Sequence, residues 1–235
     1  MKSDDWIVVG EGTPGLRGEW LLPPAPSTEK QPPVLFVRDP LAEPTYARAV
    51  AMALAHHGRR VLWVDTDSMS PAEAASDRAA DGTDESWVGE EVYPDRPAVR
   101  ELGLLVKEMG PGRPAVVGVG MGATWALLLG CQSLGVSAVG WIQGRLVYPR
   151  LSANKPVQPL EMILNLDVPV LLVVGQEDGV SSGEQVELAR ERFGAFGIEV
   201  EVERLPPGSD ADAQSASRVA ARLHLFLSST PRESR

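Results

Sequence analysis

The sequence predicts an α/β protein built on about eight mostly parallel strands, with helices on both faces of the sheet. Short apolar runs bounded by turn residues recur along the chain, and from the third run onward they alternate with helical patterns. This alternation favours parallel strands joined by right-handed crossovers. The runs are rich in valine and do not alternate with polar residues, which indicates strands buried on both sides.

The expected elements follow these patterns in chain order. The strands are Trp6–Val9, Leu16–Leu22, Val34–Val37, Val61–Val64, Ala115–Val119, Ala138–Ile142, Val168–Val174 and Ile198–Val202. The glycine-rich connection 10–15 predicts that the first two strands form an antiparallel hairpin at the sheet edge. Helical periodicity predicts helices at Tyr46–His57, Val99–Met109, Ala123–Leu134, Glu184–Phe193 and Ala213–Leu227.

Length and composition favour a single domain, 1–235, because 43% hydrophobic residues can supply one sizeable core. The segment 68–97 is acidic and is interpreted as a solvated excursion, or alternatively as a lid anchored by Trp87 and Tyr93. Residues 229–235 are expected to be a flexible tail. The helical faces carry no dimerisation signature, so the oligomeric state stays open.

The charge of the chain argues against two classes of partner. A net charge of -10 opposes binding to nucleic acid or to an anionic membrane surface, since both need a basic face. The chain has neither an apolar run of membrane-spanning length nor the apolar core of a signal peptide at its start, so a cytoplasmic protein is expected. The single cysteine, Cys131, excludes an internal disulfide and is expected to be a buried thiol.

The turn 118–122 has the pattern of a nucleophile elbow without its nucleophile. It lies between an apolar run and a helical pattern, which is the strand–turn–helix context that the elbow G-x-S-x-G requires. Gly118 and Gly122 keep the flanking glycines. Gly120 stands at the strained central position and supplies neither oxygen nor sulfur for attack. We therefore expect the elbow geometry without nucleophilic chemistry.

The order of elements, the elbow and two later segments resemble the dienelactone hydrolase family of the α/β-hydrolases over nearly the whole chain. Segment 169–178 resembles the one that delivers the catalytic aspartate of that family, with Asp178 at the matching position. The run 207–211 resembles the family's Pro-Gly-x-x-His, with Ala211 at the histidine position. Arg38 and Asp39 stand where the family has a Gln-Glu or His-Glu pair. The resemblance implies an α/β-hydrolase-like three-layer sandwich and a degenerate triad.

No histidine of the chain is expected to replace the missing base. His56 and His57 close a predicted helix, and His224 lies within the last one, so none falls at the strand end where a general base belongs. Ser181 and Ser182 follow Asp178 and could be a displaced nucleophile. They are better interpreted as N-cap residues of the next helix, since no histidine lies near enough to activate them.

The remaining site residues are expected at the carboxyl edge of the sheet. The Met121 N–H, at a helix N-terminus, could still bind an oxyanion, because a backbone donor does not depend on the lost side chain. The candidate ligand-binding residues are Arg38, Asp39, Gly120, Met121, Arg145 and Tyr148. The aspartates that follow the strands are interpreted as helix caps rather than metal ligands, so neither a metal nor a cofactor is expected.

Three functions remain open at this stage, in addition to hydrolysis by a displaced nucleophile such as Ser181 or Ser182. The leading hypothesis is a degenerate hydrolase-like protein, or pseudoenzyme, that binds a small carbonyl or carboxylate ligand, or a partner protein, at the former active-site edge. The second is a lyase, isomerase or cyclase in which Asp178, Asp39 or Tyr148 exchanges protons. The third interprets the glycines of the elbow as a dinucleotide fingerprint, with Arg145 suited to a 2′-phosphate, although the pattern alone is weak.

Overall fold

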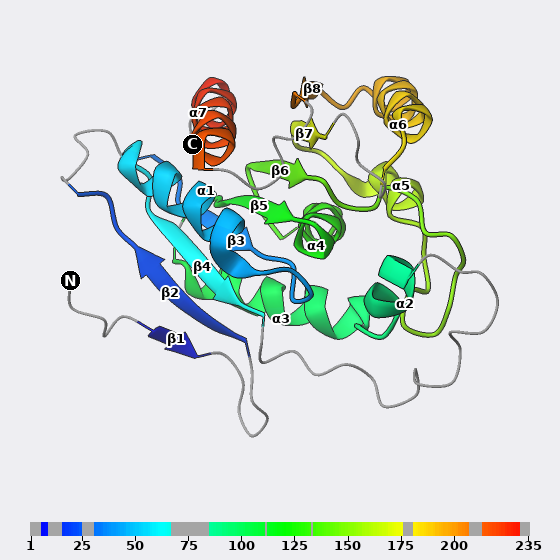
Figure 1. Ribbon diagram of the computed structural model, residues 1–235, viewed down its shortest axis with the longest axis horizontal. Helices are drawn as coiled ribbons and strands as arrows, with labels where there is room; N and C mark the ends of the chain where they lie inside the picture. The colour runs from blue at the N-terminus through cyan, green and yellow to red at the C-terminus, as the bar shows by residue number, and fades with distance from the viewer. Residues whose placement is uncertain are drawn as a thin grey trace.

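The computed structural model describes residues 6–8, 16–24, 31–66, 85–110, 112–132, 134–175, 181–206 and 213–230. Its described strands form one sheet in the order β1-β2-β4-β3-β5-β6-β7-β8 (Figure 1). The strands are β1 (Trp6–Val8), β2 (Arg17–Leu21), β3 (Val34–Val37), β4 (Val61–Asp65), β5 (Ala115–Val119), β6 (Ala138–Ile142), β7 (Val170–Val174) and β8 (Val200–Arg204).

Strand direction follows the sequence prediction. β1 pairs antiparallel with β2, and β2 pairs antiparallel with β4 at one side of the sheet. From β4 through β8 every pairing is parallel. The sheet is therefore mostly parallel, with an antiparallel hairpin at its edge, and the carboxyl ends of β3, β5, β6 and β7 all lie at the same edge.

Helices cover both faces of the sheet (Figure 1). The longer helices are α1 (Pro44–His56), α3 (Asp95–Glu108), α4 (Met121–Gly130), α6 (Gly183–Ala195) and α7 (Ala213–Ser229). The shorter ones are α2 (Glu85–Glu91), α5 (Pro159–Met162) and the 3-10 turn η1 (Ile163–Asn165). α1 and α7 pack on one face with one hydrophobic cluster, while α3, α4 and α6 pack on the other.

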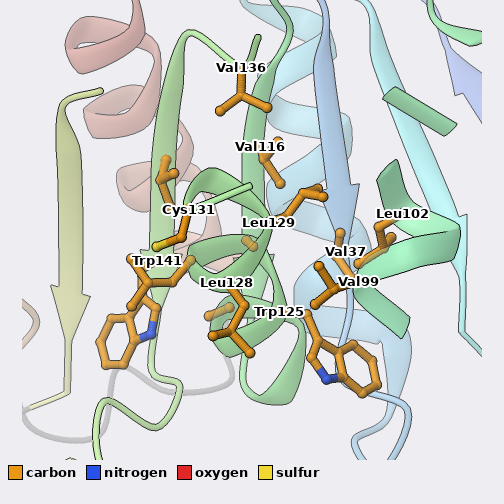
Figure 2. Close-up of a cluster of buried hydrophobic side chains, with 14 of the residues drawn as sticks. Val37, Val99, Leu102, Val116, Trp125, Leu128, Leu129, Cys131, Val136 and Trp141 are labelled. Atoms are coloured by element: carbon orange, nitrogen blue, oxygen red, sulfur yellow. The ribbon is translucent and has the colours of Figure 1, made fainter. Parts of the chain in front are cut away.

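Alternate residues of the parallel strands β3 to β7 enter the two clusters, which explains their unbroken valine-rich runs. In β5, for example, Val116 faces α4 while Val117 faces the α1–α7 layer. The cluster around α4 includes Trp125, Trp141 and the buried thiol of Cys131 (Figure 2). Burial raises the pKa of that thiol to about 12, so Cys131 packs as a small apolar side chain, as the sequence predicts.

Two parts of the sequence prediction need correction. The short helices α2, α5 and η1 were not expected, and α3 begins at Asp95 rather than Val99. The solvated excursion predicted for 68–97 is wrong for its described part, because Trp87, Glu90 and Asp95 are buried. The acidic residues there have buried basic partners from a segment more than fifty residues later, which a local charge count does not detect. Residues 67–84 and 231–235 lie outside the described residues.

Candidate functional site

The turn between β5 and α4 has the elbow geometry. Gly120 adopts φ 57° and ψ −128°, in a region that side chains rarely occupy. A Cβ on Gly118 would lie 2.1 Å from the Gly122 carbonyl oxygen, and a Cβ on Gly122 would lie 2.4 Å from the Val37 carbonyl oxygen. Both flanking glycines are therefore needed for the close approach of helix and strands.

The Asp39 carboxylate occupies the space that a nucleophile side chain needs. A Cβ on Gly120 would lie 2.2 Å from Asp39 Oδ2, which is closer than atoms can approach. The same oxygen accepts a hydrogen bond from the Met121 N–H at 3.0 Å, and Oδ1 accepts one from the Leu41 N–H at 2.8 Å. The oxyanion donor expected to be open is thus engaged by a side chain of the protein itself.

Burial and hydrogen bonding act on Asp39 in opposite directions. Burial raises the pKa of the Asp39 carboxyl above its ordinary value, and this effect outweighs the two amides and the charges of Arg38 and Lys155, which lower it. The Arg38 guanidinium donates to the carbonyl oxygens of Asp39 and Ala42, at 3.1 and 3.2 Å. Arg38 therefore holds the loop after β3, and in this arrangement its Nη1 donates to the backbone rather than to a ligand.

A cavity of about 330 Å³ opens beside this carboxylate. Its walls include Asp39 and Gly120 together with Tyr46, Val119 and Gln143. Gln143 has φ 52°, the positive-φ non-glycine residue among those described, and it follows β6 at the same sheet edge. The cavity is thus bounded by the loop after β3, the start of α1, the elbow and the turn after β6.

A buried ion-pair cluster lies behind the elbow. Arg145 Nε donates to Glu90 at 2.9 Å, and Lys155 Nζ donates to Asp95 at 2.7 Å. The Tyr148 hydroxyl donates to the second oxygen of Asp95 at 2.9 Å. We call these five residues the buried ion-pair cluster. They join α2 and the start of α3 to the segment that follows β6.

The cluster supports the first turn of α4. Trp125 Nε1 donates to Asp95 at 2.9 Å, and Lys155 Nζ lies 3.8 Å from the sulfur of Met121. Burial raises the pKa of Glu90, with Arg145 opposing, and burial together with Asp95 raises the pKa of Tyr148 well above its ordinary value. Tyr148 is therefore a hydrogen-bond donor held neutral, and Arg145 and Tyr148 bind carboxylates of the protein.

The structure separates the predicted site residues into two groups. Arg38, Asp39, Gly120 and Met121 come together around the elbow. Arg145 and Tyr148 belong to the buried ion-pair cluster, whose other members, Glu90, Asp95 and Lys155, the sequence prediction missed. In the sequence, only Trp87 and Tyr93 of the acidic segment pointed to this region. The predictions on Asp178 and Ala211 lie outside the described residues.

The described histidines lie away from the elbow. His56 and His57 end α1, which runs back from the carboxyl edge of the sheet, and His57 stacks on His224 of α7 at 5.0 Å. Ser182 caps α6, as predicted, whereas Ser181, which was also expected to be a cap, donates its hydroxyl to the Gly144 carbonyl oxygen at 2.6 Å. Within the described residues no base is placed to activate either serine.

The described residues contain no group of histidine, cysteine and carboxylate side chains that could hold a metal ion. No described helix combines the length and the apolar character that a membrane span needs. The glycines that suggested a dinucleotide fingerprint serve the tight β5–α4 turn, and the amide at the helix start faces a carboxylate, which disfavours a pyrophosphate there.

Comparison with known proteins agrees with the family resemblance that the elbow indicated. A model of the dienelactone hydrolase family matches residues 30–218. The chain belongs to the dienelactone hydrolase family. It is 26% identical over 180 residues, 74% of this chain and 69% of the relative, to a probable 2-oxo-3-(5-oxofuran-2-ylidene)propanoate lactonase from Bradyrhizobium sp..

Solved structures share the fold of this family member. Est1E from Butyrivibrio proteoclasticus superposes with a TM-score of 0.69 at 10% identity, covering 97% of this chain and 100% of that one. A dienelactone hydrolase-like promiscuous phosphotriesterase from metagenomic libraries gives 0.64 at 16% identity, covering 92% of each chain. The α/β-hydrolase fold predicted from the sequence is thereby confirmed.

The first prediction concerns the buried ion-pair cluster. Replacing Lys155 with alanine leaves the Asp95 carboxylate buried without its cation, so Lys155→Ala should lower the free energy of unfolding by about 3–5 kcal/mol. The matched control is Arg190→Ala, in an exposed pair with Glu187, which should cost about 0–1 kcal/mol. Urea denaturation measures both. Equal losses in the two variants would show that the buried pair does not stabilise this region.

The second prediction tests the occupancy of the elbow. Gly120→Ser should be strongly destabilising, because the new Cβ meets Asp39 in addition to the backbone strain at this position. Asp39→Ala removes the carboxyl group, while the contact with the Cβ of residue 39 at 2.9 Å and the backbone strain of about 1–3 kcal/mol remain, so the double-mutant cycle should give a coupling of at least about 1 kcal/mol. Gly194→Ser in α6, where a Cβ meets nothing within 4 Å, is the control. Additive effects at 120 and 39 would contradict the described carboxylate position.

Proposed function

We propose that this protein is a non-hydrolytic member of the dienelactone hydrolase family that binds a small, uncharged carbonyl compound in the cavity beside Asp39. The observation that carries the proposal is the Asp39 carboxylate, which takes both the space of the missing nucleophile and the Met121 N–H. Ester cleavage in this fold uses that donor for the oxyanion. With Gly120 in place of the nucleophile, neither half of that chemistry is available in this arrangement.

The class of ligand follows from the same carboxylate. An ionised Asp39 repels an anionic ligand at short range, which disfavours the carboxylate compounds that the sequence left open. The raised pKa extends the pH range over which Asp39 is protonated, and the protonated carboxyl can donate a hydrogen bond to a carbonyl oxygen. The cavity volume of about 330 Å³ lies at the lower end of the range for small-molecule sites. A concave site of this kind favours a small ligand over a partner protein.

A furanone lactone is a suitable probe, because the Bradyrhizobium relative is named as a lactonase of an oxofuran compound. We expect 2(5H)-furanone to shift the amide resonances of Asp39, Gly120 and Gln143 saturably, with no hydrolysis above the buffer rate. Enzymatic hydrolysis of this lactone would contradict the proposal, and its loss in Ser181→Ala would identify a displaced nucleophile. Absence of saturable shifts would contradict the binding role.

The pH dependence of furanone binding provides the third prediction. Only the protonated carboxyl donates to a carbonyl, so binding should be strongest below the raised pKa of Asp39 and should weaken as the pH rises through it. Asp39→Asn keeps an N–H donor at every pH, so its affinity should stay constant over the same range. Titrations followed by amide shifts measure both profiles. A pH profile that is unchanged by Asp39→Asn would assign the effect to another group.

A second candidate function is proton transfer at a carbon next to a carbonyl. It is favoured by a buried carboxyl of raised pKa on a cavity wall, which is the environment typical of a general base. Deuterium exchange from solvent into cyclopentanone distinguishes it from simple binding. The fourth prediction follows from the binding role: with the protein present, deuterium should exchange into cyclopentanone no faster than in buffer alone. Faster exchange that disappears in Asp39→Asn, with binding retained, would establish the enzyme instead.

A further inference from the structure

A second hollow lies along α3, with none of its lining residues shared with the cavity beside Asp39. Its volume is about 470 Å³, within the range of small-molecule sites. α3, the carboxyl-terminal half of α4 and the segment 156–162 form its walls. Val99 and Leu128, drawn in Figure 2 on these two helices, line it together with Val157 and Met162.

One side of this groove carries positive charge along its length. Arg96, Arg100 and Lys107 line it from α3, and all three side chains are exposed. Residues four and eleven positions apart on a helix point within about 40° of the same direction, so the three cations form a stripe roughly 16 Å long. Glu101 and Glu108 point about 100° away from that stripe by the same geometry.

The cations of the stripe are not neutralised by neighbours that the structure describes. Within the described part of the chain, none of the three forms an ion pair, and the lining carboxylate, Asp95, is already bound to Lys155. A protein with a net charge of -10 therefore presents a local excess of cations beside an apolar wall. This combination is complementary to a ligand that carries an anionic group and an apolar body.

We propose that the α3 groove binds an amphipathic organic anion, an apolar chain ending in a carboxylate. Arg96 and Arg100 lie one helical turn apart, about 6 Å along the axis, and their planar guanidinium groups suit a carboxylate. The Asp95 N–H donates to the Asn154 carbonyl oxygen at 3.0 Å, which brings segment 156–162 to the Arg96 end of the groove. The apolar chain of the ligand extends from the two arginines over Val99 and Leu128 towards Lys107.

Dodecanoate, used below its micellar concentration with the full chain, tests this proposal. Its saturable binding should shift amide resonances of α3, α4 and 156–162. Arg100→Glu should weaken it by about tenfold or more, the value of one charge-assisted hydrogen bond. Arg192→Glu makes the same charge change on an exposed residue of α6 and should leave the affinity unchanged. Dodecyltrimethylammonium, with the same chain and opposite charge, should bind far more weakly.

Separate results would overturn the proposal. Equal affinity for dodecanoate in Arg100→Glu and Arg192→Glu would remove the role of the stripe. If dodecyltrimethylammonium bound as tightly as dodecanoate, only the apolar chain would be recognised. If acetate bound as tightly as dodecanoate, only the carboxylate would be recognised. Asp39→Asn should leave dodecanoate binding unchanged, so failure here is distinguishable from failure of the function proposed at the elbow. Shifts confined to Asp39 and Gly120 would place the anion there and contradict a second site.

Discussion

The hydrogen bond between the Met121 amide and the Asp39 carboxylate is the contact on which the proposed site of this protein depends. It joins the loop after β3 to the first turn of α4, and it uses the backbone donor that an esterase of this fold keeps for the oxyanion. The carboxylate also accepts the Leu41 N–H, so two amides hold one acidic group at the edge of a cavity. Burial raises its pKa above the ordinary value in spite of both hydrogen bonds.

The buried ion-pair cluster is coupled to that carboxylate through charge. The positive charge of Lys155 lowers the pKa of both Asp39 and Glu90, while the Asp39 charge raises the pKa of Glu90. Such effects are strong where water is scarce, because buried charges are weakly screened. The elbow of this family member therefore lies against a charged interior in which the anions and cations largely balance. Loss of the Lys155 charge would therefore raise the pKa of both Asp39 and Glu90.

The sequence predicted the framework better than the interior. Every parallel strand was expected close to its observed bounds, because valine-rich runs between glycines and prolines are a strong local signal. The buried role of Glu90 and Asp95 was not predicted, since their partners Arg145 and Lys155 are remote in sequence. The place of Asp39 was missed for a related reason. Gly120 indicates a missing side chain, but only the folded chain brings Asp39 into the space that it leaves.

The position of the Asp39 side chain depends on the absence of a side chain at Gly120. A side chain at 120 would place its Cβ 2.2 Å from Asp39 Oδ2, so a nucleophile and the present aspartate conformation exclude each other. An empty elbow alone would leave the Met121 N–H to water or to a substrate. Here the donor is satisfied by an acidic group that has its own cavity. In the elbow of this chain the Asp39 carboxylate therefore lies where a nucleophile side chain would stand, and the function proposed for the site rests on that carboxylate.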